Sequence, residues 1–273
     1  MLTFLFWNIR GKDLSTNIVR LVNHHKVDII ILAETEGITS LRADILAALN
    51  SFHYLPEGSV CTRLKIFTRY PSTSVRLVGE GDRYRAHAFP LKDNHHLILF
   101  ACHFISLMNR DDYTLNADAR SHAHDLRELE TKESHRLSVV VGDLNLNPFA
   151  PAIAFEDGFC GLMSKTLACQ REKDKRVQAK PFYNPMWGHL GDASPGPPGS
   201  YYYSSGGSAS RYFWHTFDQV LLRPGLLSVW KDEYLIRPTG DSVVNFLTKT
   251  GVPNKKTSDH LPLIFKLDLD LKL

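Results

Sequence analysis

The sequence predicts an α/β protein, of the α+β kind, in which two packed mixed β-sheets are flanked by helices. Continuous apolar runs rich in β-branched residues, such as 27–33, recur along the 273 residues, which is typical of strands buried on both faces. Helical patterns separate the first strands, whereas short polar links join those in the middle of the chain. This mixture indicates two mixed sheets with helices outside.

The first part of the chain alternates strands with helices and then continues as strands. In 16–25, Ile18, Leu21 and Val22 fall on one face of a helix. A second apolar face of the same kind predicts a helix at 40–50. The strands expected in this part are 2–7, 27–33, 60–68, 74–78, 84–91 and 96–103.

The remaining elements follow a hairpin. Its link, 92–94, is short and polar, so the strands on either side should pair. We then expect a long polar helix at 116–136 and a buried strand at 137–141. Two further strands, at 212–222 and 261–269, complete the chain.

We expect one domain over 1–273, with a loop-rich insertion at about 158–211. That stretch carries the mixed charge run 171–176 and the Gly-, Pro-, Ser- and Tyr-rich run 194–210. Strand patterns resume after it, so we interpret it as a surface excursion and not as a linker between domains. The charge run is most simply a solvated helix or loop.

Composition narrows the class of protein. Hydrophobic residues make up 43% and charged residues 22%, as in a folded globular chain, and the formal net charge of +3 neither requires nor excludes a nucleic-acid partner. Four cysteines without a CxxC pair argue against structural zinc and for reduced thiols. No run approaches the roughly 18 apolar residues of a membrane span. We therefore expect a soluble, cytoplasmic protein and assign no oligomeric state.

Acidic, amide and imidazole side chains recur where the predicted strands begin or end. A single such residue is more often an ordinary turn residue, but repetition after strand upon strand indicates a site built at one sheet edge. Oxygen ligands without thiolates suit Mg²⁺ or Mn²⁺. The candidates are Asn8, Glu34, His103, Asp143, Asn145, Asp218, Asp259 and His260.

Six short segments, in this order, carry a resemblance to the endonuclease/exonuclease/phosphatase superfamily, the deoxyribonuclease I-like proteins. They span nearly the whole chain, and their joint order is far more specific than any one of them. The resemblance implies a four-layer fold, with two sheets between helices. The segments are FWNI (6–9), LAET (32–35), ACHF (101–104), GDLN (142–145), FDQV (217–220) and SDHLP (258–262).

The resemblance also implies a Mg²⁺ or Mn²⁺ site. Glu34 resembles the principal metal carboxylate of the family, with Asn8 and Asp259 beside it. A cation is needed there because a phosphodiester is anionic and repels an anionic nucleophile.

The same resemblance assigns roles in phosphoryl transfer. Asp143 would activate or orient the attacking water, and Asn145 would hold that water or a phosphate oxygen. His260 would contact the scissile phosphate, with Asp218 fixing its ring. His103 would be a second phosphate contact or a general acid. Glu80 and Asp82 are the nearest carboxylates that could pair with His103, and we assign neither.

The leading hypothesis is a metal-dependent phosphodiesterase that hydrolyses DNA or RNA. Candidate substrate-binding residues are Arg85 and Tyr202; the tyrosine-rich segment 199–205 either stacks on unpaired bases or packs as an ordinary rim. One alternative is an enzyme of the same fold acting on a small phosphorylated molecule or a phospholipid headgroup. Another is a non-catalytic binding module. The histidine pairs at 24–25 and 95–96, with His122 and His124, are expected on the surface.

Overall fold

The computed structural model describes residues 1–92, 95–106, 111–176, 178–204 and 212–269. Residues 93–94 of the predicted hairpin link, and residues 177 and 205–211 of the predicted insertion, therefore lie outside the described residues. The elements are β1 (Leu2–Asn8), α1 (Ser15–His25), β2 (Ile29–Ala33), α2 (Leu41–Ala48), β3 (His53–Leu55), β4 (Leu64–Thr68), η1 (Ser72–Ser74), β5 (Arg76–Glu80), β6 (Tyr84–Pro90), β7 (His96–His103), α3 (Asp112–Lys132), β8 (Ser138–Asp143), α4 (Pro151–Ala154), β9 (Gly161–Leu162), α5 (Lys165–Lys173), β10 (Phe182–Tyr183), η3 (Pro185–His189), β11 (Tyr201–Tyr202), β12 (Trp214–His215), β13 (Asp218–Leu222), η4 (Pro224–Val229), η5 (Asp232–Tyr234) and β14 (Leu263–Leu267).

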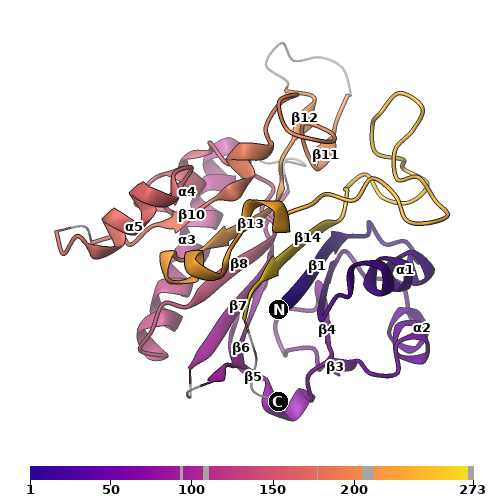
Figure 1. The fold of residues 1–273 in the computed structure, drawn as a ribbon, viewed down its shortest axis with the longest axis horizontal. Helices are drawn as coiled ribbons and strands as arrows, with labels where there is room; N and C mark the ends of the chain where they lie inside the picture. The colour runs from indigo at the N-terminus through magenta and orange to yellow at the C-terminus, as the bar shows by residue number, and fades with distance from the viewer. Residues whose placement is uncertain (93–94, 107–110, 177, 205–211, 270–273) are drawn as a thin grey trace.

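Two mixed sheets form the centre of the molecule. The five-stranded sheet has the order β14-β1-β2-β4-β3, and the seven-stranded sheet the order β5-β6-β7-β8-β13-β10-β9. β1 pairs with β2, and β7 with β8, in parallel. Helices α1 and α2 cover the outside of the first sheet, and α3 and α4 lie on the far side of the second (Figure 1). Helix α5 packs at the β9–β10 edge, where its Ala168 joins the apolar layer between the sheets. The predicted four-layer architecture is confirmed.

Successive side chains along each strand point to opposite faces of the sheet, so the core is divided into three apolar layers. In β1, Phe4 and Phe6 face the other sheet, whereas Leu5 and Trp7 face the α1 side. A third layer joins the seven-stranded sheet to α3. Full burial of each large apolar side chain contributes about 1.5–3 kcal/mol, so the interleaving of the layers is the main force that fixes the two sheets against each other.

The predicted strands and helices recur in the structure with shifted bounds; for example, the strand expected at 60–68 begins at Leu64. Three further differences are informative. Helix α3 begins at Asp112 instead of 116, because the Asp111 side chain accepts the Thr114 N–H at 2.8 Å and caps it. The single strand expected at 212–222 is divided into β12 and β13. The short strand β3 was not predicted; its pairing with β4 compensates for its length.

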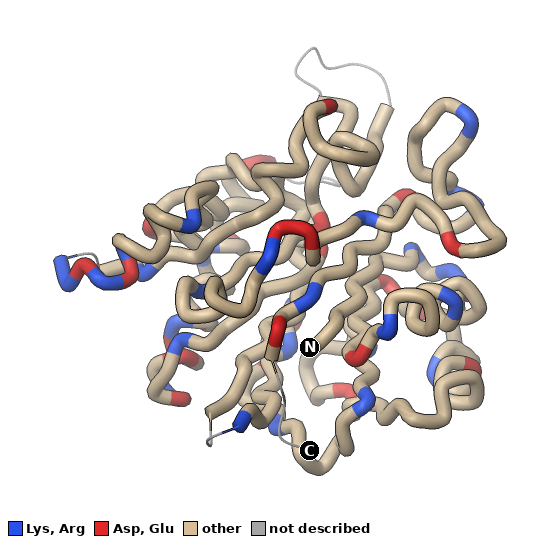
Figure 2. The backbone as a smooth tube through the Cα atoms, viewed as in Figure 1, with Lys and Arg blue, Asp and Glu red and all other residues tan. Residues whose placement is uncertain are grey.

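The segment 158–211 is less of an excursion than the sequence indicates. Its short strands β9 and β10 extend the seven-stranded sheet, with β10 paired to β13. The mixed charge run lies at the end of helix α5, which projects from the side of the molecule in Figure 2. Strands of two residues leave no periodic pattern in a sequence, so only tertiary pairing reveals them.

Other expectations concern single side chains. All four cysteines are free, as predicted. His122 was expected on the surface, but it is 6% exposed and its ring stacks on Phe104 at 4.9 Å. It lies on the apolar face of α3, where Ala119 and Leu126 also pack. None of the helices in the described ranges is long and apolar enough to cross a membrane.

Candidate active site

The candidate site residues lie close together because each sheet carries polar side chains where its strands begin or end, and these two edges face each other. In the seven-stranded sheet, β7 ends at His103 and β8 at Asp143, and the antiparallel β13 begins at Asp218. His103 and Asp218 both stand opposite Asp143 in the strand register. In the five-stranded sheet, β1 ends at Asn8, Glu34 follows β2 and His260 precedes β14. The packed sheets bring these two rows face to face.

Three strands of this edge end in the same unusual backbone conformation. Arg10, Glu34 and Asn145, which follow β1, β2 and β8, have φ of 52°, 51° and 49°. Such left-handed residues other than glycine cost about 1 kcal/mol or more, and they concentrate at functional sites. The turns are held locally: the Asn145 N–H donates to the Asp143 carboxylate at 3.0 Å, and the Arg10 N–H to the Asn8 side-chain oxygen at 3.0 Å.

Asn8 joins the two sheets as a hydrogen-bond donor. Its Nδ2 donates to Glu34 Oε1 and to Asp143 Oδ2, both at 3.0 Å. A flipped amide would place oxygen against two carboxylates, so this orientation is the one the surroundings require. Because Arg10 uses the Asn8 oxygen, the structure places Asn8 as a support of two carboxylates, whereas the sequence had assigned it to the metal.

Asp143 lies at the centre of the site. It is 1% exposed, and its Oδ2 lies 3.8 Å from His103 Nε2 and 3.7 Å from His260 Nε2. Two imidazoles therefore flank one buried carboxylate. Both separations are longer than a direct hydrogen bond, so each imidazole faces the carboxylate without being bonded to it.

Asp218 and His260 form a buried pair. His260 Nδ1 lies 2.9 and 3.1 Å from the two Asp218 oxygens. Burial alone would lower the pKa of His260, but the carboxylates of Asp218, Asp143 and Asp259 raise that pKa to about 10. The Trp7 indole N–H donates to the His260 carbonyl at 3.0 Å. The ring is thus fixed as an imidazolium, with Nε2–H turned toward Asp143.

His103 and Asn145 complete the edge. His103 is 5% exposed, its Nε2 lies 3.5 Å from Glu34 Oε1, and its Nδ1 has no hydrogen-bond partner within the described part of the chain. Glu80 instead accepts hydrogen bonds from the 59–60 backbone, and Asp82 pairs with Arg83, so neither candidate carboxylate is recorded as bonded to His103. The Asn145 amide donates to the Phe104 carbonyl at 3.0 Å.

The donor set fits a divalent cation near Glu34. Ligand atoms of Glu34, His103 and Asp143 lie within 4.8 Å of one another, and so do those of Asp143, Asp218 and His260. The second group contains the buried His260–Asp218 pair, whose raised His260 pKa favours a proton on the ring. The Glu34 side chain is 39% exposed, so a cation could reach it from solvent. Carboxylate oxygens of this kind suit hard cations.

Asp259 stands apart from both groups of three. Its carboxylate pairs with Arg10 at 3.3 Å. The sequence placed Asp259 with the metal ligands. In the structure, its recorded partner is an arginine at the mouth of the site.

A cleft of about 380 Å³ opens over Glu34 and His103. Three arginines line it, Arg10, Arg63 and Arg83, which sequence reasoning missed. Arg63 lies directly before β4, and Arg83 lies directly before β6. A position next to a strand end, which pointed to the carboxylates in the sequence, could therefore have pointed to these arginines too.

The two residues predicted to bind substrate, Arg85 and Tyr202, differ in their exposure to solvent. Arg85 is 0% exposed and donates to the carbonyls of Pro56 and Leu64 between the sheets, so it cannot meet a substrate. Tyr202 is partly exposed on β11, and its ring lies against Phe213 and Trp214.

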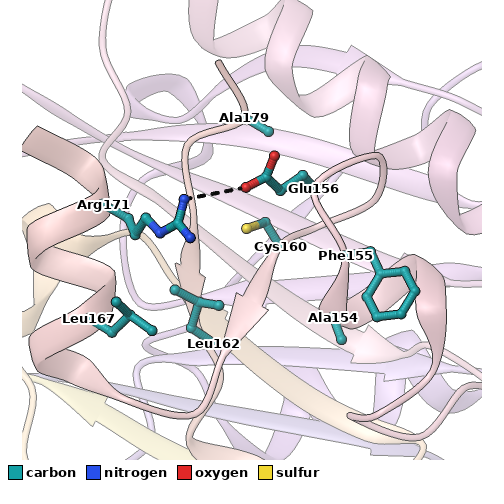
Figure 3. Close-up of a pocket in the computed structure, with 8 residues that line it drawn as sticks. All are labelled: Ala154, Phe155, Glu156, Cys160, Leu162, Leu167, Arg171 and Ala179. Atoms are coloured by element: carbon teal, nitrogen blue, oxygen red, sulfur yellow. Dashed lines mark ion pairs between the residues drawn. The ribbon is translucent and has the colours of Figure 1, made fainter. Parts of the chain in front are cut away.

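A second hollow, of about 290 Å³, lies between α4 and α5 (Figure 3). Its wall is mainly apolar, with one ion pair between Arg171 and Glu156 at 3.6 Å. It lacks the paired carboxylates and imidazoles that phosphoryl transfer requires, so it does not compete with the strand-edge site.

Comparison with known proteins agrees with this geometry. Residues 5–260 match the sequence model of the Endonuclease/Exonuclease/phosphatase family, and the chain belongs to that family. No curated protein sequence matches the chain.

Solved structures share the fold at low identity. An AP endonuclease from Archaeoglobus fulgidus is 17% identical, with 98% of this chain and 100% of that chain covered and a TM-score of 0.58. The 3′ phosphatase NExo from Neisseria, bound to product DNA hairpin, is 12% identical over 98% and 100%, with a TM-score of 0.59. The human nocturnin catalytic domain, with bound sulfate, is 14% identical over 99% and 94%, with a TM-score of 0.54. Family membership makes this chain a phosphoester hydrolase by class, and the low identities leave the substrate open.

Proposed function

We propose that this protein is a Mg²⁺- or Mn²⁺-dependent phosphodiesterase that hydrolyses DNA or RNA by attack of an activated water. The observation that carries the proposal is the buried Asp143 carboxylate between two imidazoles, with Glu34 beside it. A base, a cation site and hydrogen-bond donors for phosphate oxygens are the parts that this reaction needs.

Each described residue has a task in the proposed reaction. Asp143 orients the water and accepts its proton as the oxygen bonds to phosphorus. His260, held by Asp218, donates from Nε2 to a phosphate oxygen, where negative charge grows. His103 is placed to donate to the phosphate or to the leaving oxygen, whose bond to phosphorus breaks. Asn145 holds the water or a phosphate oxygen.

A divalent cation held by Glu34 would supply positive charge against the phosphate oxygens. The three arginines of the cleft support an anionic substrate that extends beyond the reacting phosphate. The solved structures of this fold that resemble the chain include an AP endonuclease and a 3′ phosphatase bound to DNA, which favours nucleic acid over the alternatives.

A cleavage assay tests the proposal. Wild type and His260→Ala are incubated with labelled single- and double-stranded DNA and RNA, in Mg²⁺, in Mn²⁺ or in EDTA. We expect cleavage that needs the metal and falls by about 10²-fold or more in the variant, because His260 meets the developing charge. Absence of cleavage of every polymer by folded wild type would overturn the nuclease proposal and direct the search to small phosphoesters.

A further inference from the structure

A continuous row of aromatic rings leads from the catalytic histidine to the protein surface. Tyr201 lies 4.6 Å from the His260 ring and 5.3 Å from Phe217, which stacks on His215 at 4.6 Å. From His215 the row continues to Tyr212 at 6.2 Å. It then reaches Phe149 at 5.4 Å and ends at Trp187, 6.4 Å further on. We call these rings, from Tyr201 to Trp187, the aromatic track.

The outer end of the track is open to solvent. Tyr212 is 64% exposed and Phe149 is 40% exposed, and the neighbouring Phe213 is 51% exposed. Phe155 is a comparable exposed ring elsewhere, beside the second hollow. Single exposed apolar side chains are ordinary, but a group of aromatic rings that adjoins a catalytic site marks a binding surface.

Hydrogen bonds join the segments that carry the inner part of the track. The Asn147 side chain accepts the Thr216 N–H at 2.9 Å and lies 3.1 Å from His215 Nδ1, so the loop that carries Phe149 is bonded to the β12 segment. On the other side, the Ser200 N–H donates to the His215 carbonyl at 2.8 Å. A Cβ at Gly199 would lie 2.6 Å from that carbonyl oxygen, so this close approach requires glycine. These contacts place Tyr201, His215 and the Phe149 loop next to one another.

The chemistry of the track fits nucleobases. Aromatic faces stack on any exposed base, whereas the bases of a duplex are already stacked on their neighbours. The track begins at His260, which is bonded to Asp218, and Asp218 and His103 lie on the two strands that flank Asp143 on β8. The arginine-lined cleft includes His103. A strand whose scissile phosphate meets His260 thus has its next bases beside the track.

We propose that the aromatic track binds unpaired bases on the His260 side of the scissile phosphate, so that the enzyme favours single-stranded or frayed nucleic acid. This inference rests on the proposed nuclease function. It adds a substrate class, and it assigns Tyr212 and Phe149 to specificity and not to the chemical step.

The test compares three substrates of equal length: a single strand of mixed sequence, the same strand in a duplex, and a strand of abasic tetrahydrofuran nucleotides. Wild type should have a lower KM for the single strand than for the abasic strand. Combined Tyr212→Ala and Phe149→Ala should raise the single-strand KM by about 10-fold or more, because two stacking contacts are lost. The same variant should keep kcat and should cleave the abasic strand as wild type does.

Companion variants separate stacking from folding. Tyr212→Leu with Phe149→Leu keeps apolar volume and should also raise KM, whereas Tyr212→Phe should not. Phe155→Ala is the matched control. The proposal that the aromatic track binds bases would be overturned if wild type had equal KM values for the single and abasic strands, or if the double variants had an unchanged KM. Cleavage of these substrates would still support the nuclease function. If wild type cleaves none of the three substrates, the nuclease function and the track fail together.

Discussion

The two sides of the candidate active site carry different kinds of side chain, although both adjoin the same row of strand ends, and under the proposed function they would meet different parts of a substrate. The side over Glu34 and His103 is lined by arginines. The side beyond His260 is lined by aromatic rings. Arginine pairs with phosphate, which every nucleic acid carries, whereas an aromatic face binds a base only when that base is unpaired. The fold therefore supplies general anion binding on one side and strand selection on the other.

The largest expected effect comes from the residue that both sides share. Asp143→Asn keeps the shape of the side chain and removes the charge between the two imidazoles. We expect kcat to fall by about 10²-fold or more on single strands and duplexes alike, because the base is lost. Steady-state kinetics measure this, with thermal unfolding as the check on folding. A substrate-dependent loss would mean that Asp143 belongs to one side only.

An intermediate effect is expected on the arginine side. Arg63→Ala should raise KM by about 3- to 10-fold on every polymer and reduce the slope of log KM against log salt by roughly 1, as for the loss of one phosphate contact. KM measured over a salt series tests this. Arg171→Ala, on α5, is the matched control. If the single strand alone were affected, the division between the two sides would be wrong.

The smallest effect concerns the wall of the arginine side. His122 stacks on Phe104, which lines the cleft, and faces Asp118 and Asp125, with Arg83 and Tyr84 nearby. Burial lowers the pKa of His122, but the two aspartates raise it further, so the net direction is upward. Its stabilisation is therefore complete below the unfolded-state pKa and is lost as pH rises through the higher folded-state pKa.

Unfolding free energies across that pH range should show a loss of roughly 1 kcal/mol or less that is absent in His122→Gln. His124→Gln, changed at an exposed position on the same helix, should keep the wild-type profile. A profile unchanged by His122→Gln would contradict the assignment.

The sequence predicted the fold and the strand-edge residues well, because both follow from buried apolar runs. A run such as 137–141 defines its own ends, and the polar residue after it, Asp143, must lie at the sheet edge. Arg85 shows where this reasoning could have gone further. Ala86 and Ala88 face α3, so the period of two along β6 turns Arg85 into the space between the sheets.

What the sequence did not predict depends on loop paths and on donor geometry. The cleft arginines were missed because nothing periodic fixes where a loop side chain points. The hydrogen bonds of Asn8 were not predicted, because an amide can offer oxygen or N–H, and its neighbours Glu34 and Asp143 decide which. The aromatic track required pairing between β11 and β12, which are strands too short to recognise by pattern.

The Asn8 bridge to Asp143 and the His260 bond to Asp218 each join one sheet to the other. Neither sheet holds a complete set of reacting groups. The apolar layer between the sheets, which includes the Phe4–Phe265 ring stack, therefore holds the groups of the proposed mechanism together. Under that mechanism, activity requires the docked sandwich, because Asp143 and His260 come from different sheets.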